Sequence, residues 1–262
     1  MRRALGSPLA FLRATLVRHL ANRATGIVGT EVRSGRPYRV TGAYPHDPCA
    51  FTQGLVWDDG MLLESTGLEG HSTLRRVELV SGQVVASHRL RDDVFAEGIA
   101  VVGRRIVQLT WRSGVGFLYD KETFAVLGEF AINGEGWGIA FDGYRLIMSD
   151  GSSKLRFLDA GNLEVTGTLQ VRDRDTPVVA LNDLQVVGDG VWANVWRTQR
   201  LARISLATGE VTDWLDLSPL CSLPENRDPW SCLNGVAHDP VQNRLFVTGK
   251  RWPRTFEIEL LD

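Results

Sequence analysis

The fold is decided by a short unit that first reads FTQGLVWDDGMLLESTG, at residues 51–67. The unit contains an apolar strand, a turn of Asp and Gly, and a second strand of alternating character. Such a turn supplies positions with φ > 0, which a tight hairpin requires. The later copies read FAEGIAVVGRRIVQLTW (95–111), GEGWGIAFDGYRLIMSDG (134–151), ALNDLQVVGDGVWANVW (180–196) and CLNGVAHDPVQNRLFVTGK (232–250).

The copies recur at a regular interval. Their equivalent positions, separated by 44, 40, 45 and 52 residues, are Gln53, Glu97, Trp137, Asn182 and Asn234. Each copy continues into a third strand, and four of them continue into a fourth. Periods of about 40–50 residues with four strands each are typical of β-propellers, whereas a β-sandwich has no reason to repeat in this way.

The fifth copy lacks its fourth strand, but a spare strand precedes the first copy at about residues 37–44. Pairing these two ends closes a ring and removes two exposed sheet edges. The sequence therefore predicts an all-β, five-bladed β-propeller over residues 37–262, with the ring closed by the N-terminal strand.

Composition excludes several classes of function. The net charge of −2 gives no basic field that would attract nucleic acid. Three cysteines are too few for a disulfide scaffold, and none has a zinc-type spacing. Cys221 and Cys232 either bridge one loop or remain free thiols. We expect the scattered His46, His71 and His238 to be surface or packing residues.

The first 36 residues differ from the rest. This segment is rich in arginine, and Leu9, Leu12, Leu16 and Leu20 recur at helical spacing. We expect a disordered extension or an amphipathic helix. Arginines interrupt every run that could form a signal peptide, and no apolar stretch is long enough for a transmembrane helix. The residues alone leave the compartment open.

The candidate site follows from the propeller geometry. The innermost strand of each blade lines a central channel, so the five equivalent positions converge at one mouth. The ends of the second strands add Trp111, Asp150, Trp196 and Lys250. Polar groups on an aromatic wall indicate a binding pocket. Each group also has a structural alternative: tryptophans as blade packing, Glu97 with Lys250 as an ion pair, and the asparagines as turn caps.

The same residues resemble the plant and bacterial glutaminyl-peptide cyclotransferase family. The matching words include YPHDPCAFTQGL, FAEGIA, GEGWGIAFDG, ANVW and LFVTGKRWP, and they span about residues 38–261. The resemblance implies a five-bladed propeller whose site comprises Phe51, Gln53, Glu97, Trp111, Trp137, Asn182, Trp196 and Lys250. One word departs from the family pattern: NDLQ stands at 182–185 where NELE is common, which concerns Asp183 and Gln185.

The resemblance implies conversion of N-terminal glutamine to pyroglutamate with release of ammonia. We expect Glu97 to bind the substrate's α-amine and carry its proton to the leaving nitrogen. Lys250 or Asn182 would donate to the developing oxyanion, and Gln53 would hold the substrate amide. Phe51 and the three tryptophans would bind the substrate.

The expected partners are peptides or proteins with N-terminal glutamine, acted on by a monomer without metal or cofactor. Family precedent suggests a periplasmic or secreted protein, and without a signal the chain would stay in the cytoplasm. Two other functions stay open. A calcium-dependent lactonase would use Glu97, Asp150, Asn182 and Asn234 as oxygen ligands, and a catalytically silent propeller would only bind peptides.

Overall fold

The structure, a computed structural model, describes residues 35–226 and 228–261. In these residues the strands form five four-stranded antiparallel sheets and one two-stranded hairpin. The first blade consists of β2 (Thr52–Asp58), β3 (Met61–Thr66), β4 (Thr73–Val77) and β5 (Val84–Arg89). The second consists of β6 (Ala96–Val102), β7 (Arg105–Thr110), β8 (Val115–Asp120) and β9 (Val126–Ala131). The third consists of β10 (Ile139–Phe141), β11 (Arg145–Ser149), β12 (Lys154–Asp159) and β13 (Val165–Gln170). The last two consist of β16 (Leu181–Val187), β17 (Gly190–Val195), β18 (Arg200–Ser205) and β19 (Val211–Asp216); and β20 (Cys232–Asp239), β21 (Arg244–Lys250), β22 (Arg254–Leu260) and β1 (Tyr38–Pro45).

The innermost strands of the five blades form a ring. Strand β2 contacts β6, β6 contacts β10, β10 contacts β16, β16 contacts β20, and β20 contacts β2 again. Each blade then runs outward through hairpins to its fourth strand. The five-bladed propeller predicted from the repeat is therefore confirmed.

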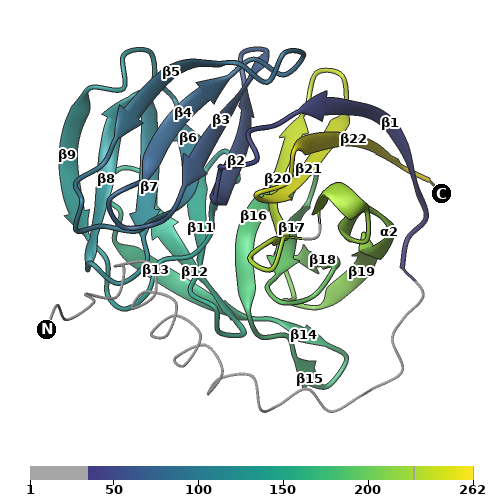
Figure 1. Cartoon of the computed structure of the whole chain (residues 1–262). Helices are drawn as coiled ribbons and strands as arrows, with labels where there is room; N and C mark the ends of the chain where they lie inside the picture. Colours follow the sequence, from purple (N-terminus) through teal and green to yellow (C-terminus); the bar gives the residue numbers. More distant parts are fainter. Residues whose placement is uncertain (1–34, 227, 262) are drawn as a thin grey trace, which may run out of the picture. The chain divides into compact units, whose positions relative to one another are not determined.

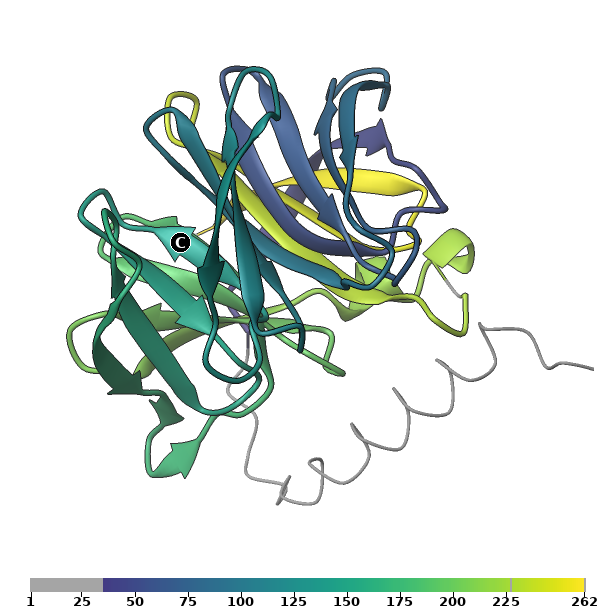
Figure 2. The same cartoon turned by 90° about the vertical axis from the view of Figure 1, so that its left-hand side faces the viewer.

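The ring is closed by the first strand of the described chain. Strand β1 pairs antiparallel with β22, from Tyr38 opposite Leu260 to Pro45 opposite Arg254. Figures 1 and 2 both show this purple strand beside the yellow C-terminal one. The closure expected at about residues 37–44 is thus present, and it gives the fifth blade the fourth strand that its own segment lacks.

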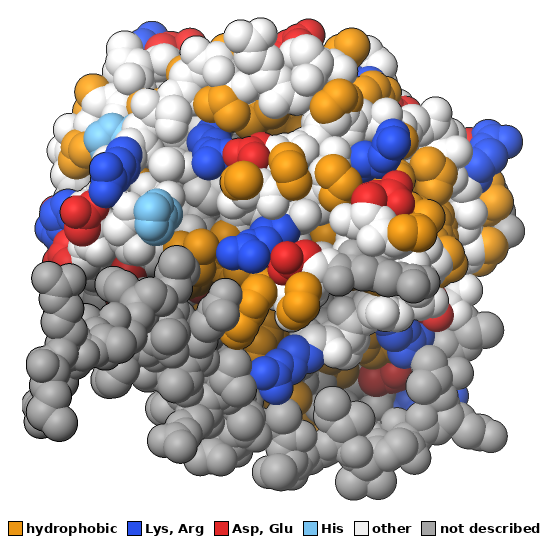
Figure 3. All heavy atoms as spheres, in the orientation of Figure 1, with side chains coloured by type: hydrophobic (Ala, Val, Ile, Leu, Met, Phe, Trp, Pro, Cys, Tyr) orange, Lys and Arg blue, Asp and Glu red, His pale blue; other side chains and the backbone are white. Residues whose placement is uncertain are grey.

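The core consists of hydrophobic layers between neighbouring blades. One layer joins Ile147 and Phe157 of the third blade to Val191 and Trp214 of the fourth. Every residue of β17 is buried, whereas β5 and β9 on the outside alternate between exposed and half-buried positions. Hydrophobic side chains on the face drawn in Figure 3 are interspersed with charged ones. This arrangement is ordinary for a protein surface.

Two insertions between the repeat units were not predicted. A hairpin of β14 (Arg172–Asp173) and β15 (Thr176–Pro177) projects away from the blades in Figures 1 and 2. A short helix, α2 (Ser218–Cys221), and a single 3₁₀ turn, η1 (Pro224–Asn226), precede the fifth blade. Both lie outside the repeating pattern, which is why the periodicity gave no sign of them.

The cysteines are free thiols in this structure. Cys221 ends α2 and Cys232 begins β20, and burial together with the neighbouring Cys232 thiol raises the pKa of Cys221 to about 12. Of the two alternatives that the sequence left open, the structure therefore has the unbridged one.

The predicted N-terminal extension falls largely on residues 1–34, which lie outside the described residues. Within the part of the chain that is described, no helix combines the length and the apolar character needed to cross a membrane.

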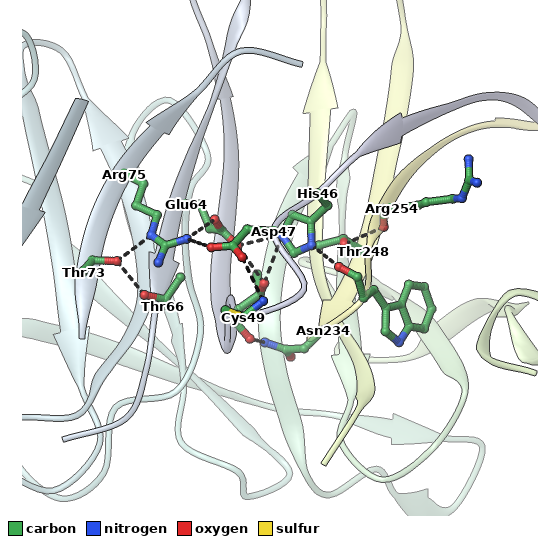
Figure 4. Close-up of polar contacts among 12 residues, drawn as sticks. His46, Asp47, Cys49, Glu64, Thr66, Thr73, Arg75, Asn234, Thr248 and Arg254 are labelled. Atoms are coloured by element: carbon green, nitrogen blue, oxygen red, sulfur yellow. Dashed lines mark hydrogen bonds and ion pairs between the residues drawn. The ribbon is translucent and has the colours of Figure 1, made fainter. Parts of the chain in front are cut away.

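A buried ion pair lies beside the closing strand (Figure 4). His46 directly follows β1, and its Nε2 lies 2.9 Å from Oε1 of Glu64 in β3. Its Nδ1 contacts the carbonyl oxygen of Trp252, which belongs to the fifth blade's loop after β21. Since these two acceptors require a donor on each ring nitrogen, we infer that His46 is an imidazolium. His46 is therefore not the surface or packing residue that the sequence suggested, but a charged link between the first and fifth blades.

The pair holds both charges inside the protein. Burial alone would lower the pKa of His46, but Glu64 and the Trp252 carbonyl raise it above its usual value. Burial alone would raise the pKa of Glu64, but His46, Arg75 and the Thr52 hydroxyl lower it below its usual value. Arg75 also donates to Asp47 at 2.7 Å, which extends the network over the loop before β2.

We predict that His46→Gln lowers the free energy of unfolding by about 3 kcal/mol, because the buried Glu64 loses its hydrogen-bonded counter-ion and keeps the more distant Arg75, at 3.9 Å. His46 contributes fully below its unfolded pKa of 6.5 and loses this contribution as the pH rises through its higher folded pKa. Glu64 contributes fully above 4.5 and loses its part as the pH falls through its lower folded pKa. Urea unfolding should therefore show the largest difference between wild type and variant at pH 4.5–6.5.

The control is Asp92→Asn, which breaks the exposed pair between Asp92 and Arg89. Its effect should stay within about 0.5 kcal/mol, because exposed ion pairs contribute little. Equal losses in the two variants would contradict a special role for the buried pair.

Candidate active site

The innermost strands share an irregularity near their starts. In β2, β6, β16 and β20 the pairing register shifts within the first five residues, so one or two residues stand outside the ladder. These residues are Gln53, Glu97 with Gly98, Asn182 with Asp183, and Asn234 with Gly235. In the third blade, Trp137 donates its N–H to the Ser149 carbonyl just before β10. A bulge redirects the side chain that it frees, so four of the five positions that the repeat made equivalent share this irregularity, and Trp137 lies just before the inner strand of its blade.

Glycines next to these positions let the inner strands approach closely. A Cβ on Gly138 would lie 2.0 Å from the carbonyl oxygen of Asn182, and one on Gly98 would lie 2.7 Å from the Cα of Gly138. The Gly98 N–H also donates to the Trp137 carbonyl at 2.7 Å, which joins the second blade to the third. No side chain fits at these contacts, so glycine is required for the residues beside it to meet.

Glu97 and Gln53 are in direct contact. The Nε2 of Gln53 donates to Oε1 of Glu97 at 3.1 Å, and both side chains are buried, 2% and 5% exposed respectively. Burial raises the pKa of Glu97 well above its usual value. The charge of Lys250 opposes this rise, while the carboxylates of Glu135 and Asp183 add to it. Glu97 is thus a carboxyl group that holds its proton more firmly than an exposed glutamate does.

Lys250 lies at the end of β21, and its Nζ is 4.8 Å from the centre of the Phe51 ring. Its charge acts on Glu97. No direct ion pair joins the two among the residues that the structure describes. The structure therefore does not contain the Glu97–Lys250 ion pair that the sequence left open as a structural alternative. The ammonium is instead held over an aromatic face, where a cation–π attraction stabilises it.

Aromatic rings continue from Phe51 along one side of the site. The Phe51 ring meets Phe95 edge-on at 6.2 Å between centroids, and Phe95 meets Trp111 at 5.7 Å. Trp137 and Trp196 form a further edge-on pair at 5.8 Å. The Phe51–Phe95 contact joins the first blade to the second and the Trp137–Trp196 contact joins the third to the fourth, whereas Phe95 and Trp111 both belong to the second blade. The expected aromatic wall therefore includes Phe95, which the sequence analysis missed.

Glu135 connects the two groups of rings. Its Oε2 accepts the indole N–H of Trp111 at 3.1 Å and that of Trp137 at 2.9 Å. Its Oε1 accepts two hydrogen bonds from Arg112, both at 3.1 Å. The sequence analysis missed this residue too, although it stands inside the word GEGWG. Phe95 could have been found from the parallel between FTQG and FAEG.

Several buried side-chain oxygens have no hydrogen-bond partner among the described residues, and two of them belong to the eight site residues that the resemblance implies. These are Oε1 of Gln53 and Oδ1 of Asn182, whose side chain is 3% exposed. Buried polar atoms are nearly always hydrogen-bonded. These two are therefore the acceptors best placed to receive an N–H group from a ligand.

Two residues expected at the channel mouth have other roles. The Nδ2 of Asn234 donates to the backbone carbonyls of Thr52 at 3.0 Å and Gln53 at 3.2 Å, so it ties the fifth blade to the first and caps no turn of its own. Asp150 accepts from Arg156 at 2.7 Å within the third blade. In the described chain, no three His, Cys, Asp or Glu side chains are grouped so as to hold a metal ion.

The NDLQ segment at residues 182–185, which departs from the common family pattern, lies partly inside the channel. Asp183 is fully buried, and its Oδ2 accepts the Val236 N–H of the fifth blade at 2.9 Å. Burial raises the pKa of Asp183 to about 8, against the lowering effect of Val236 and other backbone N–H groups. The amide of Gln185 donates to the carbonyl of the adjacent Val186 at 2.9 Å. Asp183 is thus a tie between blades beside Asn182, and Gln185 faces its own backbone.

Comparison with known proteins agrees with this geometry. A sequence profile of the family described as "Glutamine cyclotransferase" matches residues 11–260. The chain is 40% identical over 225 residues to the Arabidopsis thaliana protein named "Glutaminyl-peptide cyclotransferase", a match that covers 84% of this chain and 70% of the relative.

The chain belongs to the glutamine cyclotransferase family. The fold agrees as well, because the crystal structure of Myxococcus xanthus glutaminyl cyclase superposes with a TM-score of 0.81 at 37% identity. That match covers 87% of this chain and 98% of the solved one. The resemblance noted in the sequence to the glutaminyl-peptide cyclotransferases is thereby confirmed.

In this member of the glutamine cyclotransferase family we predict that Gly138→Ala reduces stability and activity together. The added Cβ would force the third blade away from Asn182, and overpacking of this kind costs about 1–3 kcal/mol. Thermal unfolding and a steady-state assay measure the two effects.

Gly128→Ala is the matched control. A Cβ at Gly128, in β9, meets nothing within 4 Å, and this glycine does not have a positive φ. The control should unfold within about 0.5 kcal/mol of wild type, as surface substitutions usually do. If Gly138→Ala behaved like it, the close contact at the ring centre would be wrong.

Proposed function

We propose that this chain converts the N-terminal glutamine of peptides or proteins to pyroglutamate and releases ammonia. The observation that carries the proposal is the buried Glu97, which accepts a hydrogen bond from Gln53 and is acted on by the charge of Lys250, itself held over the Phe51 ring. Family membership supports the reaction class, because the Arabidopsis relative is named a glutaminyl-peptide cyclotransferase.

The reaction is an intramolecular acyl transfer. The substrate's α-nitrogen attacks the δ-carbon of its own side-chain amide, so that a carbon–nitrogen bond forms and a tetrahedral oxyanion develops. The bond to the amide nitrogen then breaks, and ammonia leaves with one proton that originates on the α-amine. A catalyst must therefore move one proton, stabilise one oxyanion and hold the chain folded back on itself.

Glu97 suits the proton transfer. As a carboxylate it would hold the neutral α-amine by accepting one of its N–H groups, take a proton from that nitrogen as it attacks, and give the proton to the departing amide nitrogen. The pKa of Glu97 is raised by burial, which brings its proton affinity closer to that of the groups it serves. The hydrogen bond from Gln53 fixes one carboxylate oxygen and leaves the other for the substrate.

Gln53, Asn182 and Lys250 suit the amide group of the substrate. The partnerless Oε1 of Gln53 would accept an N–H of the substrate amide. We propose that the Asn182 amide N–H₂ or the Lys250 ammonium donates to the oxyanion. A donor to an oxyanion contributes most where water is excluded, and Asn182 and Lys250 are only 3% and 5% exposed.

Phe51, Trp111, Trp137 and Trp196 would enclose the glutaminyl side chain. Flat, rigid rings limit its conformations, and a cyclisation gains much of its acceleration from holding reacting atoms close together. Nothing in this scheme needs a metal, a cofactor or a second chain, so we propose a metal-independent monomer.

The test is ammonia release from a short peptide that begins with glutamine. We expect wild-type turnover to continue in the presence of a chelator. Glu97→Gln should lower kcat by about 10²–10⁴-fold, the usual contribution of general acid–base catalysis.

Glu129→Gln, at an exposed position on β9, serves as the control and should retain full activity. Near-normal activity of Glu97→Gln would remove the proton-transfer role. Loss of wild-type activity on adding chelator would point to a metal-dependent propeller instead.

A further inference from the structure

Glu135 is the charged residue that contacts the aromatic wall most extensively. It lies in the segment between β9 and β10, and its side chain is 15% exposed. Its two oxygens accept four hydrogen bonds: one from each of two indoles and two from Arg112. A charged acceptor in a partly buried setting makes stronger hydrogen bonds than a neutral one.

The two indoles come from different blades. Trp111 directly follows β7 of the second blade, and Trp137 precedes β10 of the third. Apart from their contacts with Glu135, the two rings are held by other aromatic neighbours, Phe95 for Trp111 and Trp196 for Trp137. One carboxylate oxygen therefore sets the angle and spacing of two adjacent walls of the proposed site.

Arg112 holds Glu135 in this position. Its guanidinium donates from Nε and Nη2 to Oε1, and its Cζ lies 4.1 Å above the Trp111 ring. Arg112 thus covers one face of the Trp111 ring, whose N–H Glu135 accepts. The three side chains form a closed set in which each contacts the other two.

We propose that Glu135 is a positioning residue for cyclisation, which fixes the walls formed by Trp111 and Trp137 by accepting a hydrogen bond from both indoles. This inference rests on the proposed function for its kinetic consequences, but the hydrogen bonds themselves can be tested without turnover.

The charge of Glu135 has a second consequence at Glu97. Three other ionisable groups act on Glu97, from three parts of the ring: Lys250 from β21 favours its ionised form, while Glu135 and Asp183 of β16 favour its protonated form. Removing the charge of Glu135 should therefore lower the pKa of Glu97. A purely structural wall residue would have no such effect.

Two variants separate these roles. Glu135→Gln keeps an oxygen that can accept from the indoles but removes the charge, whereas Glu135→Ala removes both. In kcat/KM measured against pH with one glutaminyl peptide, both variants should move the acid limb to lower pH, because each removes a negative charge that raises the pKa of Glu97. Glu135→Ala should in addition lose about 10–100-fold in kcat/KM, as when other supporting partners of a site are removed.

Glu129→Gln is the matched control. It removes the same charge from a pair with Arg91, at 3.1 Å, in which the arginine also lies over an aromatic ring, that of Phe117. The acid limb of this variant should coincide with that of wild type. An unchanged limb in both Glu135 variants, or the same shift in the control, would overturn the electrostatic role.

The indole N–H signals in a ¹H–¹⁵N spectrum provide the readout that needs no activity. The chain has 8 tryptophans, and Glu135→Ala should shift chiefly the signals of Trp111 and Trp137. If neither signal moved, the positioning role would be wrong whatever the kinetics. If both moved and the wild type released no ammonia from any glutaminyl peptide, the positioning would stand and the proposed function would fail.

Discussion

The whole structure depends on how closely the innermost strands approach one another at the centre of the ring. Gly138 lies against the backbone of Asn182, and Gly98 against Gly138, at distances that exclude any side chain. The bulges beside these glycines turn the neighbouring side chains out of their ladders. The same contact therefore packs the blades and brings Glu97 together with residues from other blades. A ring with wider spacing would keep its sheets and lose its site.

Closure of the ring is the second requirement, and it is achieved by more than a strand pairing. Strand β1 completes the fifth blade, and His46, directly after it, carries a buried charge to Glu64 of the first blade. Asn234 adds a neutral tie across the same junction. Such polar links hold the junction in one geometry, because a charge or amide left unpaired there would be costly. Phe51 and Gln53 follow immediately along the chain, so the junction and the site are built from one segment.

The three carboxyl groups of the site have different roles, because their surroundings differ. Glu97 accepts one hydrogen bond from Gln53, and its deep burial raises its pKa. Glu135 has four donors and a guanidinium beside it, and it acts through the indoles that it holds. Asp183 joins blades through backbone N–H groups. The charges of Glu135 and Asp183 both add to the rise in the pKa of Glu97, so the three carboxyl groups are linked through Glu97.

The sequence by itself determined the number of blades and the closing strand, and its resemblance to the family gave the eight residues of the proposed site as a prediction. A repeat of similar units predicts a ring of blades, and residues at equivalent positions of the units then lie close together at its centre. Only the tertiary structure decided which partners those residues take. The partners of Glu135 and of His46 depend on contacts between different blades, and a pattern within one repeat holds no information about them. Asn234 shows the limit most directly: its place in the repeat was read correctly, but its bonds to the neighbouring blade depend on distances that exist only in the folded ring.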